Sequence, residues 1–232
     1  MLLPKEKMKL LSMMDIFEPL SQEQIEELIE RLPDAHFEQG QIFYGPEDRS
    51  EALFLLKRGR VRIYRLDQYG REFTLAMVEA GTIFGEMALT GQRLPGAYAE
   101  AAEPTLVCIL KREDVERLVR EYPDVGLKMI AVLSERLRLY ENRLEDIGLK
   151  SVPARLASLI LQLAESEGVV TPEGCKIPTR YAHHQLATMI GANRVSVTNA
   201  FAQLQDIGVV ELRRRHIYIK DIEALKRAAE SK

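Results

Sequence analysis

The sequence predicts an α+β protein with an N-terminal antiparallel β-roll of the jelly-roll type, one long helix and a small C-terminal domain. Three observations carry this prediction. Short apolar runs separated by turn residues fill positions 35–110, a continuous helical repeat follows Pro123, and two short helical segments joined by Gly191 lie near the C-terminus. We therefore divide the chain into a roll at 1–121, a long helix at 122–148 and a C-terminal domain at 149–232.

The amino-acid composition limits the classes of protein to which this chain can belong. The 232 residues are 46% hydrophobic and 29% charged, which is enough apolar material for a buried core and argues against wholesale disorder. No uncharged apolar run approaches the roughly 18–20 residues of a membrane span, and the first residues become charged too early for a secretory signal. We expect a cytoplasmic protein with no membrane partner.

Cysteine and histidine usage points away from metal and cofactor chemistry. Cys108 and Cys175 are too few for a disulfide framework, and the four histidines contain no set with metal-ligand spacing. A single histidine, His36, lies in the first 150 residues, where an enzyme of the metal-binding cupin type would need a cluster. We expect no metal, no cofactor and no enzymatic activity.

Charge is distributed unevenly along the chain. Residues 1–150 carry 21 basic and 27 acidic side chains, whereas residues 176–220 carry 7 basic and 2 acidic ones. A basic segment on an acidic chain indicates contact with a polyanion, and the alternative is a solvated charged face.

The roll is predicted from alternation and turns. Ser21 and Gln24 fit a capping box before a helix that ends at Pro33. Strands are then expected at 53–56, 61–64 and 73–78, with a turn at 67–70. Cys108 lies in an apolar strand, so an inert buried thiol is expected there.

The long helix carries a heptad stripe. Its apolar residues are spaced 3, 4, 3, 4 and 3 apart: Ile130, Leu133, Leu137, Tyr140, Leu144 and Ile147. A sustained repeat of this kind favours pairing with a second copy over packing on the roll. We expect a homodimer with parallel long helices.

The C-terminal domain begins after Gly148, with Ser151 as the N-cap of its first helix. A loop is expected at 168–178, followed by helices at 182–190 and 193–207. Two strands are expected within 209–219 around an arginine-rich turn, and a last helix at 221–230.

The two short helices have helix–turn–helix spacing. Gly191 lies where the turn needs a backbone without a side-chain penalty, and Leu186, Ile190, Val197 and Phe201 are expected to be buried. This leaves the start and outer face of the second helix for base edges in a major groove, through Arg194, Val195, Ser196 and Asn199. Phosphate contacts are expected from His183, His184, Arg213, Arg214 and Arg215, the three arginines forming the tip of a wing.

These segments together resemble the Crp/Fnr family of bacterial transcription regulators. The resemblance covers nearly the whole chain and rests on four stretches: Gly81 to Leu89, Ser134 to Leu137, Gly191 to Val197, and Val209 to Ile217. It implies a cyclic-nucleotide-binding-like roll and a winged helix–turn–helix. It also implies a homodimer that binds an inverted-repeat operator on double-stranded DNA and usually activates RNA polymerase.

Two departures from the family pattern bear on specificity. The recognition helix commonly reads Arg-Glu-x-x-x-Arg in the family, and here Val195 and Asn199 replace the Glu and the second Arg. The operator is therefore expected to differ at the bases those residues would read. An Arg-Val start resembles the nitrogen-control regulators of cyanobacteria and implies a GT-rich half-site.

The resemblance also places an effector pocket in the roll. Gly85 and Glu86 match the residues that hold the ribose in cyclic-nucleotide members, but the Arg-Ser pair that holds the phosphate reads Pro95-Gly96. Tyr140 and Glu141 replace the small hydroxyl residues that meet the adenine. An unneutralised phosphodiester in a closed pocket is costly, so we expect no response to cyclic AMP. Arg136 is a candidate anchor for a small acid, as in the 2-oxoglutarate-binding members.

Two alternatives remain open at this point. DNA binding is either independent of an effector or requires an unidentified small molecule, as in a ligand-gated sensor. The choice between activator and repressor depends on operator position, and activation is favoured only by the resemblance.

Overall fold

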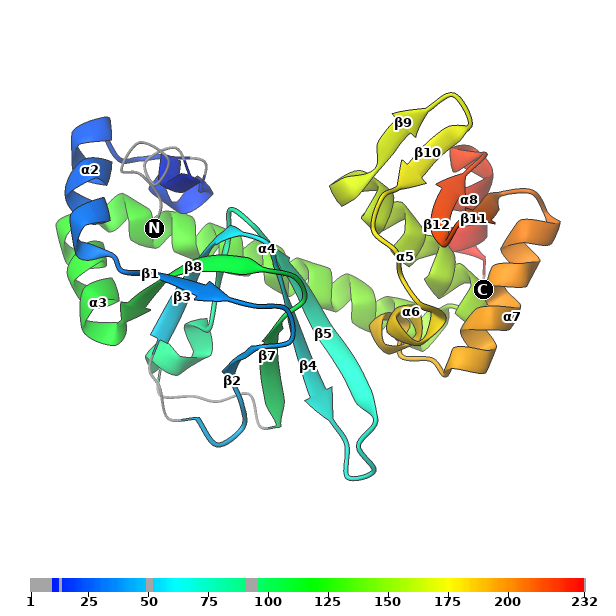
Figure 1. The fold of residues 1–232 in the computed structure, drawn as a ribbon, viewed down its shortest axis with the longest axis horizontal. Coiled ribbons are helices and arrows are strands. Elements are labelled where there is room, and N and C mark those ends of the chain that lie inside the picture. The colour runs from blue at the N-terminus through cyan, green and yellow to red at the C-terminus, as the bar shows by residue number, and fades with distance from the viewer. Residues whose placement is uncertain (1–9, 13, 49–51, 91–95, 232) are drawn as a thin grey trace. The chain divides into compact units, whose positions relative to one another are not determined.

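The computed structural model describes residues 10–12, 14–48, 52–90 and 96–231. They form two compact units, 1–138 and 139–232 by residue number, and the helix α4 (Pro123–Leu149) runs from the first into the second. Figure 1 shows the order of the elements along the chain. None of the helices in the described ranges is long and apolar enough to cross a membrane.

The first unit is a roll of two antiparallel sheets, as the alternation in the sequence predicts. One sheet has the order β1-β8-β3-β6 and the other β2-β7-β4-β5. The strands are β1 (Asp34–Phe37), β2 (Ile42–Tyr44), β3 (Ala52–Arg58), β4 (Arg60–Leu66), β5 (Glu72–Glu79), β6 (Ile83–Phe84), β7 (Ala97–Ala101) and β8 (Thr105–Lys111). Short helical elements surround them: η1 (Asp15–Phe17), α2 (Gln22–Arg31), η2 (Glu86–Thr90) and α3 (Arg112–Glu121).

The core of the roll has two layers. Between the sheets lie aromatic rings, with Phe54 stacked on Phe84 at a centroid separation of 4.8 Å and Phe43 edge-on to Phe84 at 5.0 Å. A second cluster joins the other face of β3 to the helices, including Leu53 and Leu55. Strand β3 is buried on both faces, which explains its unbroken apolar run.

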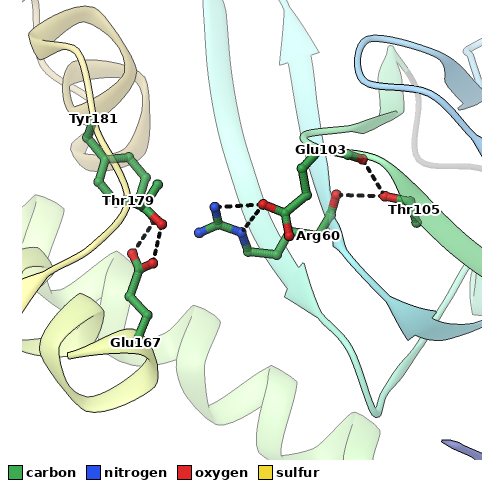
Figure 2. A network of polar contacts seen from close by, with 6 residues as sticks. All are labelled: Arg60, Glu103, Thr105, Glu167, Thr179 and Tyr181. Carbon is green, nitrogen blue, oxygen red and sulfur yellow. Dashed lines mark hydrogen bonds and ion pairs between the residues drawn. The ribbon is translucent and has the colours of Figure 1, made fainter. Parts of the chain in front are cut away.

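Close approach of the chain to itself explains one glycine and one ion pair. A Cβ added at Gly59 would lie 2.7 Å from the Pro104 carbonyl oxygen, and Gly59 has a φ of +89°. Beside this contact, Arg60 pairs with Glu103 at 3.0 Å, and the Thr105 hydroxyl donates to the Glu103 carbonyl at 2.7 Å (Figure 2). These contacts join the start of β4 to the turn before β8.

The second unit packs four helices against a small sheet. Its elements are α5 (Val152–Glu167), β9 (Val169–Thr171), β10 (Gly174–Ile177), α6 (His183–Ile190), α7 (Arg194–Asp206), β11 (Val210–Arg213), β12 (His216–Ile219) and α8 (Ile222–Glu230). The sheet has the order β11-β12-β10-β9 and is antiparallel throughout. Ser151 caps α5 as predicted, and Asp221 caps α8 by accepting from the Ala224 N–H at 2.8 Å.

The expectation of a plain loop at 168–178 is wrong. This stretch contains β9 and β10, and β10 pairs with β12 through Cys175 opposite Ile219. Pro172 and the two glycines at 168 and 174 give the stretch the composition of a loop. The β-branched residues Val169, Val170 and Thr171 before the turn are a local strand signal that the loop expectation overlooked, and β10 also pairs with β12, more than 40 residues away.

Candidate nucleic-acid interface

The turn between α6 and α7 is built as its glycine predicts. Gly191 has a φ of +63°, and the Ala192 N–H donates to the Ala187 carbonyl at 3.0 Å. Asn193 then starts α7 by accepting from the Ser196 N–H at 2.8 Å. The burial of Leu186, Ile190, Val197 and Phe201 is confirmed.

The start of α7 presents an exposed mixed surface. Arg194 and Asn199 are exposed, Val195 is 68% exposed, and Ser196 is half-buried. An exposed guanidinium offers two donors to a guanine edge, and an exposed valine offers apolar contact to a thymine methyl. The first backbone N–H groups of an α-helix suit a phosphate in general, and in α7 the N–H of Ser196 already donates to Asn193.

His183 is held in one orientation by α7. Its Nδ1 lies 2.9 Å from the Thr198 hydroxyl, and its ring stacks on Phe201 with centroids 5.5 Å apart. His184 is exposed and lies beside it at the start of α6. The histidine pair therefore has one fixed ring and one solvent-facing ring at the edge of the helix pair.

The segment that leads into α6 is anchored by a carboxylate that sequence reasoning missed. Glu167, at the end of α5, accepts hydrogen bonds from the Thr179 hydroxyl and from the Tyr181 phenol, the latter at 2.7 Å (Figure 2). Glu167 is 12 positions from Thr179 and 14 positions from Tyr181 in the chain, so no helical repeat relates them. This anchor fixes the approach of the chain to His183.

The wing is the β11–β12 hairpin, and its tip has an unusual backbone. Arg214 and Arg215 have φ values of 48° and 68°, in a turn that normally takes Asn-Gly. Both side chains are exposed. Two bulky residues in the left-handed region carry strain of about 1 kcal/mol or more each, which is typical of a functional position.

Arg213 differs from the other two wing arginines. Its Nε lies 2.5 Å from a Glu211 oxygen, and this hydrogen bond is the main cause that lowers the pKa of the Glu211 carboxyl. Lys220 lies 3.5 Å from the other Glu211 oxygen. Glu211 therefore offsets part of the positive charge of Arg213, although the Arg213 side chain is exposed like those of Arg214 and Arg215.

Helix α4 has one face on the roll and one face in solvent. Val125 and Met129 are buried in the roll core, whereas Ile130, Leu137 and Leu144 are 60%, 58% and 69% exposed. Ile147 is 38% exposed, and Leu133 and Tyr140 are half-buried. The predicted heptad stripe is therefore a largely exposed apolar face.

Two of the predicted pocket residues, Glu86 and Arg136, contact each other. Arg136 Nη1 lies 3.0 Å from Glu86 Oε1, and Arg136 also donates to the Ile83 carbonyl. The second Glu86 oxygen is buried and has no hydrogen-bond partner among the described residues. Gly85 has a φ of +84°, and an added Cβ would lie 2.7 Å from the Ala52 carbonyl oxygen. Tyr140 follows Arg136 by four positions on α4, and Pro95 lies outside the described residues.

The Cys108 thiol is buried beside an ion pair. Its Sγ lies 3.3 Å from Asp34 Oδ1, which also accepts from Lys57 Nζ at 2.7 Å. Burial is the main cause that raises the pKa of this thiol to about 11. The prediction of a buried thiol is confirmed.

Comparisons with known proteins agree with this geometry. The family profile described as "Cyclic nucleotide-binding domain" matches residues 35–122, and the profile described as "Crp-like helix-turn-helix domain" matches residues 154–228. The Global nitrogen regulator of Synechocystis sp. is 30% identical over 191 residues, covering 82% of this chain and 85% of that protein. The Cyclic AMP receptor protein of Thermus thermophilus is 29% identical over 214 residues, covering 92% and 96%.

Two solved structures share the fold along most of the chain. A CooA mutant from Carboxydothermus hydrogenoformans is similar with a TM-score of 0.76 and 28% identity, covering 88% of this chain and 90% of that one. A transcriptional regulator of the CRP/FNR family from Thermus thermophilus has a TM-score of 0.73 and 26% identity, covering 86% and 99%.

Proposed function

Because the chain belongs to the Crp/Fnr family of transcription regulators, we propose that it binds an inverted-repeat operator as a homodimer and activates transcription. The observation that carries the proposal is the exposed start of α7. Arg194, Val195 and Asn199 present a guanidinium, a methyl group and an amide on one accessible helix end. Such a set reads base edges when the helix enters a major groove.

Phosphate contacts flank this reading surface. Arg214 and Arg215 form the exposed tip of the wing, and His183 and His184 begin α6. Cations and free backbone N–H groups on both sides of a recognition helix fix its register without reading sequence. Ser196, half-buried beside Arg194, can bond either a base or a phosphate.

The exposed apolar stripe of α4 is the reason that we propose a homodimer. Ile130, Leu137 and Leu144 would stay in water in a single chain, and a parallel copy of the same helix covers them with matching knobs and holes. Two recognition helices then lie about 34 Å apart, which is one turn of DNA. The two-fold symmetry of such a dimer requires an operator made of two inverted half-sites at this spacing.

The partner at the promoter is RNA polymerase, as the family resemblance implies. The half-site is proposed to be GT-rich, because the Arg194-Val195 start is shared with regulators of the nitrogen-control type. Relatives at 28–30% identity include the global nitrogen regulators of three cyanobacteria, which makes this half-site the first to test.

Cyclic AMP is not proposed as the effector. One Glu86 oxygen is already engaged by Arg136, and the positions of the phosphate-binding pair read Pro95-Gly96. Proline has no backbone N–H, and glycine offers a single backbone N–H. This pair therefore supplies too few donors to hold a phosphate. DNA binding is therefore proposed to be independent of cyclic AMP.

A ligand-gated sensor is the second candidate, and one observation favours it. The other Glu86 oxygen is buried without a hydrogen-bond partner among the described residues, and a small molecule with a hydroxyl or amide donor would satisfy it. In that case an unidentified ligand enters beside the Glu86–Arg136 pair and DNA binding depends on it.

Selection of bound duplexes from a random DNA pool tests both candidates with the full-length chain. Without added ligand, we expect enrichment of an inverted repeat, and the addition of cyclic AMP changes its affinity by less than about twofold. Enrichment only after addition of a small-molecule extract supports the ligand-gated candidate. If no duplex is enriched under any of these conditions, sequence-specific DNA binding is contradicted.

A further inference from the structure

The carbonyl end of α6 is held by arginines from two other helices. Arg155 of α5 donates from Nη1 to the Ile190 carbonyl at 2.8 Å and lies 3.5 Å from the Gly191 carbonyl. Arg143 of α4 donates to the Met189 carbonyl. We call Arg143 and Arg155 the α6 clamp.

The clamp supplies hydrogen-bond partners for the last carbonyl groups of α6. The last carbonyls of an α-helix have no partner within the helix, and here the Ala192 N–H returns to Ala187. The Met189 and Ile190 carbonyls accept from guanidinium groups, which also lie at the negative end of the helix dipole. Burial lowers the pKa of the Arg143 guanidinium.

The helix pair behind the clamp is coupled internally. His183 of α6 bonds Thr198 of α7 and stacks on Phe201, so a movement of α6 carries α7 with it. The joint between α4 and α5 is bridged as well, because Lys150 lies 2.7 Å from Asp146 and donates to Ser158 at 3.0 Å. A guanidinium that reaches from α4 to α6 therefore acts on the placement of the whole recognition unit.

We propose that Arg143 and Arg155 are positioning residues that set the angle of the α6–α7 pair against the last turns of α4. Arg143 directly precedes Leu144, an exposed residue of the apolar stripe. In a dimer paired along that stripe, this angle determines the distance between the two recognition helices. The clamp then selects the spacing between half-sites, and this inference rests on the proposed dimeric binding to an inverted repeat.

Operators with altered spacing test the clamp. The probes are the selected operator and two versions whose central spacer is one base pair longer or shorter, each titrated with full-length protein. Arg143→Met removes the guanidinium, and Arg143→Lys keeps the charge with a shorter reach. Arg138→Met is the matched control, because Arg138 lies on the same helix, is exposed and pairs with Glu135.

Loss of spacing discrimination is the expected result. Arg143→Met lowers affinity for the selected operator by about tenfold or more, the usual effect of losing a hydrogen bond to a charged group, and leaves the two altered operators nearly unchanged. Arg143→Lys restores part of the discrimination, and Arg138→Met behaves like the original protein. Arg155→Lys gives a second variant if Arg143→Met does not fold.

Three other outcomes overturn the inference in different ways. An equal loss on all three operators assigns Arg143 a general structural role, and no loss on any of them shows that Arg143 does not set the spacing. An original protein that binds without regard to spacing removes both the inference and the proposed dimeric reading. Circular dichroism and sedimentation of each variant establish that folding and dimer mass are intact.

Discussion

The Nδ1 atom of His183 lies 2.9 Å from the Thr198 hydroxyl, which itself donates to the Arg194 carbonyl at 2.9 Å. A hydroxyl has one proton, so Thr198 accepts from His183 and places that ring's proton on Nδ1. Together with the stacking on Phe201, this hydrogen bond fixes the orientation of the His183 ring relative to α7.

Replacing Arg194 by alanine is expected to remove selectivity and leave the fold intact. A bidentate contact to a guanine is worth about 1–3 kcal/mol, so operator affinity falls about fivefold to a hundredfold. Affinity for a scrambled duplex changes little, because phosphate contacts supply it. Competition between the two duplexes measures the ratio. An equal loss on both duplexes assigns Arg194 to the phosphate backbone.

Replacing Leu137 by aspartate is expected to split the dimer. The substitution places a carboxylate in the apolar stripe, and burying an unpaired charge costs several kcal/mol, which raises the dissociation constant by about a hundredfold or more. Sedimentation equilibrium measures it. Leu139→Asp is the matched control, since Leu139 is 47% exposed on the same helix but lies outside the stripe. Unchanged mass for Leu137→Asp contradicts pairing along α4.

At the wing tip, a change that raises stability is expected to lower DNA affinity. Changing Arg214 to Asn and Arg215 to Gly suits the left-handed backbone at both positions and is expected to raise the melting temperature by about 2–4 °C for each kcal/mol of strain released. The same change removes two cations and lowers affinity for all duplexes, with a smaller salt dependence. A double lysine variant keeps the charges and the strain. Unaltered DNA affinity in the Asn-Gly variant excludes the wing from phosphate contact.

Cys108 predicts a loss of stability in alkaline solution. Its thiol has a folded pKa of about 11 against a reference of 9.0. Between these values the folded state holds a proton that the unfolded state has released, so the free energy of unfolding falls as pH rises, by up to about 1.4 kcal/mol per pH unit. Urea unfolding at pH 8 and pH 10, compared with Cys108→Ala, isolates this contribution. The same slope in both proteins disproves it.

Reading the sequence found the elements whose signals are local. The alternation in β4, the capping box at Ser21, the turn at Gly191 and the arginine-rich hairpin each depend on residues a few positions apart. The candidate site residues Arg194, Val195 and Asn199 follow from the same logic, because a helix with one buried face must expose the other. Their roles on DNA remain predictions.

Contacts between distant segments could not be read in this way. The Glu167 anchor, the α6 clamp and the β10–β12 pair join residues 12 to 46 positions apart without a repeating pattern. Glu86 and Arg136 were singled out separately by resemblance, yet their pairing across 50 positions depends on how α4 packs on the roll.

By itself, the sequence determined that this protein has a roll, a long helix with an apolar stripe and a two-helix reading unit with a basic hairpin. Periodicity and turn chemistry depend on near neighbours in the chain, so they can be recognised from the sequence alone. Only the tertiary structure decided that Arg143 and Arg155 reach the end of α6, that Glu86 meets Arg136 and that 168–178 joins a sheet. Long side chains and edge strands find their partners only after packing has brought the elements together.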